Sequence, residues 1–223
     1  MTHWMLLAAL VTSAHGRHVR AKPAHVKPAA APAPAPAEAP PAAPVEAAPA
    51  ALEVDPDLPK AGDTALSFRL RALNPDMDGQ FVGIDSLVGE DREDTKSKLL
   101  VLSFMASYCK PCKKEMPYLQ KLYAKYKDQG LRVLMVAVDS DPAGQAVVTD
   151  LVKQNGITFP VLKDIGGLTS RRYLGSRTPL PSMFIIRPDG SIEAVKRGYN
   201  EEAGQALLDV VQKAVGAPVE AVK

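Results

Sequence analysis

Two long apolar runs form the centre of the hydrophobic pattern of this chain. Residues 99–106 are apolar at every position except Ser103, and residues 131–138 are apolar at every position except Arg132. Continuous apolar runs of this length are typical of strands that are covered on both faces of a sheet. Both segments are therefore predicted to be central strands.

Helix signals follow each of these runs and recur near the C-terminus. Apolar residues recur at three- and four-residue spacing over residues 119–126 and over residues 203–214, as on the buried face of a helix. Asp141 and Pro142 supply a capping carboxylate and a first-turn proline, so a helix is predicted from there to about Gln154. The chain is therefore predicted to alternate strands with helices.

Shorter segments complete the predicted sheet. Residues 65–73 alternate between apolar and polar positions and are followed by turn residues at 74–79, which predicts a hairpin at the start of the domain. Downstream we expect an extended segment at 161–162, a short helix or turn at 165–174, and a hairpin of strands 182–187 and 192–198 around a turn at 188–191. This order predicts an α/β fold with a mixed sheet.

Composition separates the first 59 residues from the rest. More than half of the 20 prolines lie between Pro23 and Pro59, mostly among alanines. Residues 21–59 are therefore predicted to be an extended linker without fixed structure. Residues 60–217 are then predicted to be one domain, and residues 218–223 a short tail.

An apolar segment precedes the linker. Residues 4–11 are apolar and are followed by small residues, which suits the core of an export signal but is too short to span a bilayer. We assign residues 1–20 as a signal-like segment and expect a periplasmic or extracytoplasmic protein, soluble or N-terminally tethered. No lysine or arginine precedes the run, and Arg17 and Arg20 follow it. A clipped longer signal, or a cytosolic tail with a chance apolar stretch, is the alternative.

Charge and histidine placement exclude several classes of function. Lysine and arginine together number 27, against 25 for aspartate and glutamate, so a strongly basic nucleic-acid-binding surface is not expected. All four histidines precede residue 26, so the predicted domain has none to activate a cysteine hydrolase or to complete a metal site. We expect no cofactor, no stable metal and no nucleic acid partner.

The only two cysteines of the chain are Cys109 and Cys112, at the predicted start of a helix. Two thiols at this spacing can close a small disulfide and open it again, whereas a zinc site would need more ligands nearby. A thiolate at a helix start is stabilised by unpaired N–H groups and by the helix dipole. Cys109 is therefore expected to be the nucleophile and Cys112 the resolving thiol. A purely structural disulfide is the alternative.

Two segments carry a resemblance to a known family. Residues 103–117 read SFMASYCKPCKKEMP, and residues 178–190 read TPLPSMFIIRPDG. Together they resemble the TlpA/ResA-like branch of the thioredoxin superfamily, whose members are exported or membrane-tethered thiol-disulfide oxidoreductases. The resemblance extends over about residues 60–216 and implies a thioredoxin-like fold, with helices flanking a mixed central sheet. Peroxiredoxins share the scaffold, but their peroxidatic cysteine lies in a different strand-to-helix signature, which residues 108–112 do not resemble.

Several residues around the cysteines depart from the family pattern. Tyr108 and Met105 stand where members usually carry tryptophan, and Tyr108 is expected to contact substrate. Ser103 stands where thioredoxin has a buried aspartate that accepts a proton from the second cysteine. Glu115 matches a glutamate of the family signature and lies nearly one helical turn after Cys112, so it is the candidate proton acceptor. A solvated first-turn carboxylate is the alternative for Glu115.

Four further residues are candidates for substrate binding. Lys110 either stabilises the thiolate further or is solvated surface, and Pro111 is expected to stiffen the turn between the cysteines. The resemblance implies a cis peptide bond before Pro181, where Leu180 supplies backbone contacts to an extended substrate segment. Pro179 is the competing position for the cis bond, and two ordinary loop prolines are the alternative.

These observations predict a monomeric enzyme that reduces protein disulfides. Reduction is favoured over oxidation because proline rather than histidine follows Lys110. By resemblance, the partners are extracytoplasmic proteins, with apocytochrome c as one example, and a membrane thiol-electron transporter as the electron donor. A redox-inert module that binds extended peptides, with the cysteines as a staple, is the alternative from a different class.

Overall fold

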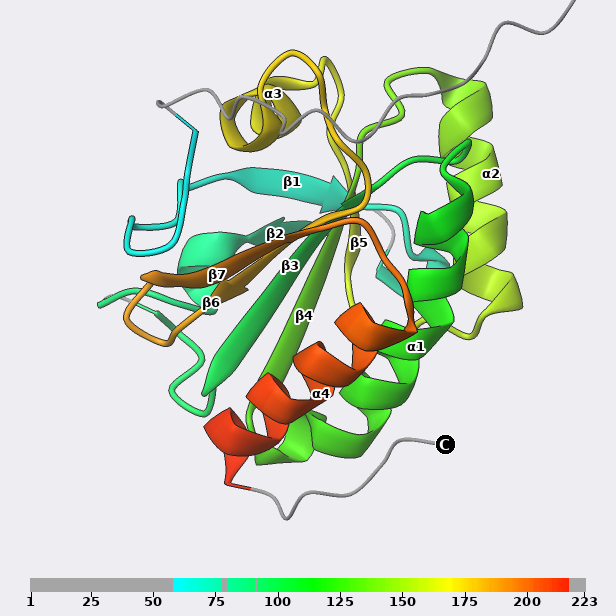
Figure 1. Ribbon diagram of the computed structural model, residues 1–223. Coiled ribbons are helices and arrows are strands. Elements are labelled where there is room, and N and C mark those ends of the chain that lie inside the picture. The colour runs from blue at the N-terminus through cyan, green and yellow to red at the C-terminus, as the bar shows by residue number, and fades with distance from the viewer. Residues whose placement is uncertain (1–57, 78–79, 91, 217–223) are drawn as a thin grey trace, which may run out of the picture. The chain divides into compact units, whose positions relative to one another are not determined.

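The computed structural model describes residues 58–77, 80–90 and 92–216. The predicted signal-like segment, nearly all of the predicted linker and the predicted tail lie outside these residues. In the described part, helices cover both faces of a mixed sheet, as the sequence predicts (Figure 1). The described fold begins two residues before the predicted boundary: Pro59 is buried, and Leu58 Cδ1 lies 3.2 Å from the position that a Cβ on Gly175 would take.

The sheet formed by the described residues has seven strands in the order β2-β1-β5-β4-β3-β6-β7. The strands are β1 (Arg69–Ala72), β2 (Phe81–Gly83), β3 (Leu99–Met105), β4 (Leu131–Ala137), β5 (Val161–Lys163), β6 (Ser182–Ile186) and β7 (Ile192–Arg197). The helices are α1 (Lys110–Tyr126), α2 (Pro142–Gln154), α3 (Leu168–Leu174) and α4 (Glu201–Val215).

The two apolar runs form the centre of this sheet. β3 pairs in parallel with β4, from Leu99 opposite Leu131 to Met105 opposite Ala137. β3 also pairs antiparallel with β6, and β4 pairs in parallel with β5. Every side chain of β3 is buried. The prediction of a central strand covered on both faces is confirmed.

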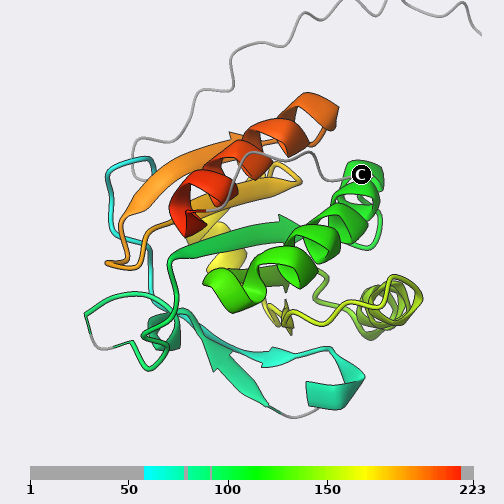
Figure 2. The same cartoon turned by 90° about the horizontal axis from the view of Figure 1, so that it is seen from below.

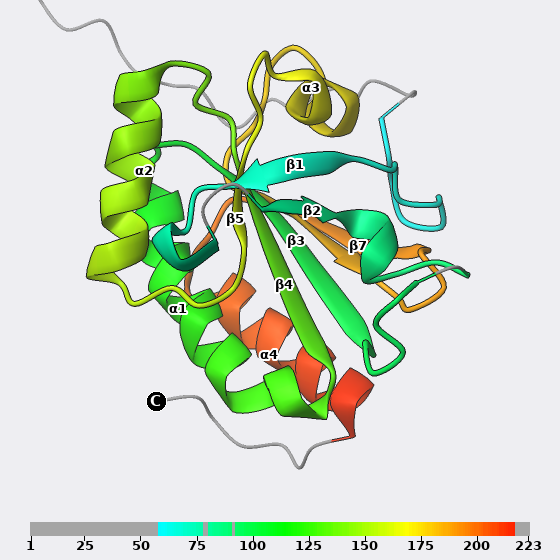
Figure 3. The ribbon, with the colours of Figure 1, turned by 180° about the vertical axis from the view of Figure 1, so that it is seen from behind.

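Alternate residues of β3 face two separate hydrophobic clusters. Leu99, Val101 and Met105 belong to a cluster that also contains buried residues of α1, α2 and α4. The intervening residues of β3 belong to a second cluster with α3 and the N-terminal part of the domain. Figures 2 and 3 show α1 and α4 together on one side of the sheet. Ser103 is the one polar residue of β3, and it lies on the face that α1 covers.

Local sequence signals set the helix ends. Asp141 caps α2 by accepting a hydrogen bond from the Gly144 N–H at 2.8 Å, and the helix runs to Gln154 as predicted. Asn200 caps α4 in the same way, accepting from the Ala203 N–H at 2.7 Å. The cap places the start of α4 at Glu201, ahead of the apolar stripe from which the helix was predicted.

The predicted N-terminal hairpin is present as β1 and β2, which pair antiparallel from Arg69 opposite Gly83 to Arg71 opposite Phe81. β1 also pairs antiparallel with β5, so the hairpin extends the sheet beyond its parallel strands. Among the described residues, no helix has the length and apolar character that crossing a bilayer requires.

Candidate active site

Cys109 and Cys112 form a disulfide at the beginning of α1, with a Cα–Cα distance of 5.3 Å. Cys109 is the N-cap residue of this helix, and its Sγ accepts a hydrogen bond from the Cys112 N–H at 3.2 Å. Cys109 is 7% exposed and Cys112 is fully buried. In the dithiol form, the N-cap position would stabilise a thiolate at Cys109, because free N–H groups and the positive end of the helix dipole meet there.

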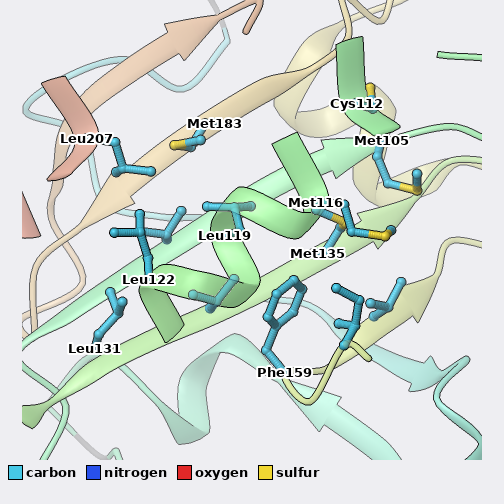
Figure 4. Close-up of a cluster of buried hydrophobic side chains, with 14 of the residues drawn as sticks. Met105, Cys112, Met116, Leu119, Leu122, Leu131, Met135, Phe159, Met183 and Leu207 are labelled. Atoms are coloured by element: carbon cyan, nitrogen blue, oxygen red, sulfur yellow. The ribbon is translucent and has the colours of Figure 1, made fainter. Parts of the chain in front are cut away.

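The surroundings of the disulfide are rich in sulfur. Figure 4 shows Met105 and Met116 close to Cys112 at one end of the cluster beneath α1. Both methionines are fully buried, so the inner side of the disulfide is closed to water. Attack by a partner can therefore reach only the Cys109 side.

A hydrogen-bonded turn positions the residues before Cys109. The Asp139 carboxylate, which is 5% exposed, accepts from the Ser107 N–H at 2.9 Å and from the Ser107 hydroxyl at 2.6 Å. The Cys109 N–H donates to the Ala106 carbonyl oxygen at 3.1 Å. Asp139 follows β4, whereas Ser107 follows β3, so this contact joins the ends of two parallel strands.

Glu115 lies inside the protein rather than in solvent. It is 1% exposed, and its Oε2 accepts a hydrogen bond from the Ser103 hydroxyl at 3.1 Å, while Oε1 has no partner. Burial raises the pKa of Glu115 to about 8, and the bond from Ser103 opposes this rise. The alternative of a solvated first-turn carboxylate is therefore wrong. Hydrophobic packing of α1 against β3 carries this side chain inward.

Tyr199 lies near Glu115, on the segment that joins β7 to α4. Burial, and then the negative charge of Glu115, raise the pKa of Tyr199. Its ring packs against Tyr118, with centroids 5.9 Å apart, and the Tyr118 hydroxyl donates to the Gly204 carbonyl oxygen at 2.5 Å. α1 and α4 are thus tied together beside the buried carboxyl group.

The Leu180–Pro181 peptide bond is cis, so the competing assignment to Pro179 is wrong. Pro181 is buried, and its carbonyl oxygen accepts from the Gly198 N–H at 2.8 Å. The Leu180 side chain packs against the cluster that contains both cysteines. The loop before β6 and the start of α1 therefore share one hydrophobic environment, which the resemblance implied.

The remaining candidates lie at the surface around the disulfide. Tyr108 is 73% exposed, Lys110 is exposed and Pro111 is half-buried at the start of α1. Tyr108 also lines a groove of about 330 Å³ whose other walls are the segments after β4, around the start of α3 and before the cis-proline. We define these as the groove residues: Tyr108, Val138, Ser140, Gly166, Gly167, Ser170, Arg171, Ser176 and Thr178.

No group of three or more histidine, cysteine, aspartate or glutamate side chains in the described part of the chain is arranged to hold a metal ion.

Sequence reasoning missed three contributors to this site: Asp139, Tyr199 and the groove around Arg171. Asp139 carried a usable signal, because polar residues at the carboxyl ends of adjacent parallel strands meet at one edge of a sheet. Tyr199 and Arg171 carried none, since each reaches the site only through the packing of a later helix. Ser103 was noted as a departure from the family, but its bond to Glu115 was not predicted.

Comparisons with known proteins agree with this geometry. The profile of the AhpC/TSA family matches residues 62–195, which is more than half of the chain and includes both cysteines and Pro181. The thiol-disulfide oxidoreductase ResA of Halalkalibacterium halodurans is 33% identical over 159 residues, covering 71% of this chain and 81% of that protein. ResA of Oceanobacillus iheyensis is 34% identical over 140 residues, which cover 62% of this chain. The match spans 66% of the length of that protein, just under two thirds.

Solved structures show the same architecture. A candidate thiol:disulfide interchange protein DsbE from Chlorobium tepidum is 27% identical, with a TM-score of 0.58, covering 71% of this chain and 99% of that one. A candidate protein disulfide isomerase from Bacteroides thetaiotaomicron is 26% identical, with a TM-score of 0.60, covering 71% and 91% of the two chains. The sheet, the cysteine pair and the cis-proline loop therefore occur in a fold that other disulfide-exchange proteins share.

Proposed function

Because the chain belongs to the AhpC/TSA family and to its ResA-like thiol-disulfide oxidoreductases, we propose that it reduces disulfides of protein substrates outside the cytoplasm. One observation carries the proposal: the Cys109 sulfur caps α1, while Cys112 is fully buried. A purely structural staple would not need this asymmetry. The asymmetry suits one thiol that attacks and a second that resolves.

The proposed reaction begins with the dithiol form. The Cys109 thiolate attacks one sulfur of the substrate disulfide, the substrate S–S bond breaks, and the second substrate sulfur leaves as a thiolate and takes a proton. Cys112 then loses its proton and attacks the Cys109 sulfur of the mixed disulfide. The substrate leaves with two thiols, and this protein carries the Cys109–Cys112 disulfide. Two electrons pass from the dithiol to the substrate.

Glu115 is the proposed proton acceptor for the second step. It lies three residues after Cys112 on α1, so the two side chains lie on the same side of the helix. Oε2 is bonded to Ser103, which leaves the unpartnered Oε1 to take the proton. A carboxyl group whose pKa is about 8 exchanges its proton near neutral pH, as a general acid or base requires.

Export, the electron donor and the substrates are parts of the same proposal. The apolar residues 4–11 support export. In an oxidising compartment the dithiol form must be regenerated, and a membrane thiol-electron transporter supplies the electrons. Apocytochrome c is a candidate substrate, and the enzyme acts as a monomer.

Export is tested by fusing residues 1–60 to a reporter enzyme that is active only after export. A reporter that stays inactive contradicts export.

Reduction of insulin by dithiothreitol tests the activity. The parent protein should accelerate precipitation of the insulin B chain, and Cys109→Ser should abolish the acceleration. Cys112→Ser should accumulate a mixed disulfide through Cys109, visible as a mass increase that dithiothreitol reverses. Equal rates for the parent protein and Cys109→Ser would favour the redox-inert peptide-binding module instead.

The direction of the reaction is tested by the reduction potential of the cysteine pair in a defined thiol buffer. A potential near the value of thioredoxin, about −270 mV, supports a reductase. A potential near about −120 mV would indicate an oxidant and overturn this part of the proposal.

A further inference from the structure

The groove beside Tyr108 lies against the proposed reaction centre. Tyr108 immediately precedes the nucleophilic cysteine, and Thr178 lies three residues before the cis-proline. The other walls follow β4 and β5, whose carboxyl ends point to the same edge of the sheet as that of β3. Figures 1 and 3 show α3 at this end of the sheet. A segment bound at Cys109 would therefore reach the groove.

Arg171 is the only charged side chain among the groove residues. It is exposed, and among the described residues no carboxylate forms an ion pair with it. Its Nη1 lies 3.1 Å from the position that a Cβ on Gly167 would take. A side chain at residue 167 would therefore crowd the guanidinium, whereas glycine leaves it room.

The carboxylates near the groove are engaged elsewhere. The Asp139 carboxylate accepts both hydrogen bonds from Ser107. The Asp164 carboxylate accepts from the Thr169 N–H at 3.2 Å and from the Ser170 N–H at 2.7 Å, at the start of α3. Neither forms an ion pair with Arg171, so its positive charge is available to a bound molecule.

Two exposed apolar side chains are neighbours in the sequence of the groove glycines. Ile165 is 64% exposed and Leu168 is 62% exposed, and they flank Gly166 and Gly167 in the sequence. With Tyr108 at 73%, they are three of the five large apolar side chains that are well exposed in the described residues. Exposed apolar side chains close in the sequence to an unpaired charge are typical of a recognition surface.

We propose that this groove binds an acidic segment of the substrate polypeptide, with a substrate carboxylate on Arg171 and an apolar neighbour against Tyr108, Ile165 and Leu168. This inference rests on the proposed function, because it assigns a preference among protein disulfides. A volume of about 330 Å³ is at the lower end of the range for small-ligand sites, so the groove accommodates one or two side chains rather than a folded domain. Arg171 thus selects the sequence beside the target cysteine.

Three peptides test the preference. Each is a disulfide-linked homodimer of a short peptide that has one cysteine. The two residues before that cysteine and the two after it are all glutamate in the first peptide, all glutamine in the second and all lysine in the third. The second-order rate constant for reduction by the reduced full-length protein is measured at low salt and at about 0.5 M NaCl. At low salt the glutamate peptide should react roughly three- to tenfold faster than the lysine peptide. The ratio should approach one at high salt, since exposed charges are screened.

Arg171→Gln should reduce this ratio at low salt, and Arg171→Glu should invert it, with each rate expressed relative to that of the glutamine peptide in the same variant. Arg172→Gln is the matched control. Arg172 neighbours Arg171 on α3 but donates to the Ser67 carbonyl oxygen at 3.0 Å and lies outside the groove. The parent ratio should persist in this variant.

The possible failures can be told apart. A glutamate-to-lysine ratio in Arg171→Glu equal to that of the parent overturns the inference while leaving the proposed function intact, provided that the glutamine peptide is reduced. A parent preference for the lysine peptide overturns it as well. Reduction of none of the three peptides contradicts the proposed function together with the inference.

Discussion

The hydroxyl of Ser103 donates a hydrogen bond to Oε2 of Glu115 at 3.1 Å, inside the hydrophobic layer between β3 and α1. Both residues are almost completely buried. A single polar position in an apolar strand thus faces a single carboxyl group on the helix that carries the cysteines. Ser103 stands where thioredoxin has a buried aspartate, and Glu115 brings a buried carboxyl group to the same layer from the helix.

Stability should depend on pH through Glu115. Burial raises its pKa from 4.5 to about 8, so between these values the unfolded chain loses the proton while the folded protein keeps it. The free energy of unfolding therefore falls as pH rises from about 4.5 to about 8. Glu115→Gln removes this pH dependence. The free energy of unfolding of the variant relative to that of the parent should therefore improve from pH 5 to pH 9 by on the order of a few kcal/mol. Urea unfolding of both proteins with the disulfide intact measures this difference, and parallel pH curves for the two proteins would contradict the prediction.

Ser103→Ala should raise the pKa of Glu115 further, because the hydrogen bond from Ser103 opposes the effect of burial. The pH at which the Cys112 step accelerates should then move upward in single-turnover measurements. The variant should also lose roughly 1–3 kcal/mol at pH 9, where the ionised carboxylate has lost its donor. Ser182→Ala is the control, because this buried serine in β6 donates to the Pro179 carbonyl oxygen instead. An unchanged pH profile in Ser103→Ala would remove Ser103 from the proton step.

Asp139→Ala should disturb the turn before Cys109. It leaves the Ser107 N–H without its acceptor, which costs about 1–3 kcal/mol. Insulin reduction should slow as well, because the segment leading to the nucleophile loses its anchor. Asp141→Ala is the matched control: it removes the cap of α2 at a cost of about 1 kcal/mol, but it should preserve the rate. Equal losses of rate in the two variants would show that Asp139 has no special role.

Gly144→Ala should be destabilising although alanine favours helices. A Cβ at residue 144 would lie 2.6 Å from Asp139 Oδ1, so either the carboxylate or the start of α2 must move. We expect a loss of about 1–3 kcal/mol in the free energy of unfolding, against a gain of about 1 kcal/mol in helix propensity. The double variant with Asp139→Gly gives the test, because the Asp139 Cβ would itself lie 2.9 Å from the new Cβ and must be removed as well. If contact with Asp139 is the cause, Gly144→Ala costs less in that background. Additive losses would contradict this explanation.

The sequence predicted elements well where local chemistry decides them. The bounds of α2 follow from Asp141 and Pro142, which fix its first turn through a cap and a preset φ. β3 and β4 follow from apolar runs that only a doubly covered strand can bury. The alternating pattern of residues 65–73 predicted a longer strand than β1, because pairing with β2 and β5 extends only over Arg69–Ala72.

By itself, the sequence determined that a cysteine pair stands at the start of a helix, after a buried strand, in a chain of the TlpA/ResA type. Tertiary structure decided which other side chains surround that pair. Ser103 and Glu115 are 12 residues apart, and Ser107 and Asp139 are 32 apart. Arg171 reaches the groove from a later helix still. Strand and helix periods fix which face a residue takes, whereas the pairing of β3 with β4 and the packing of α1 on β3 decide which faces meet.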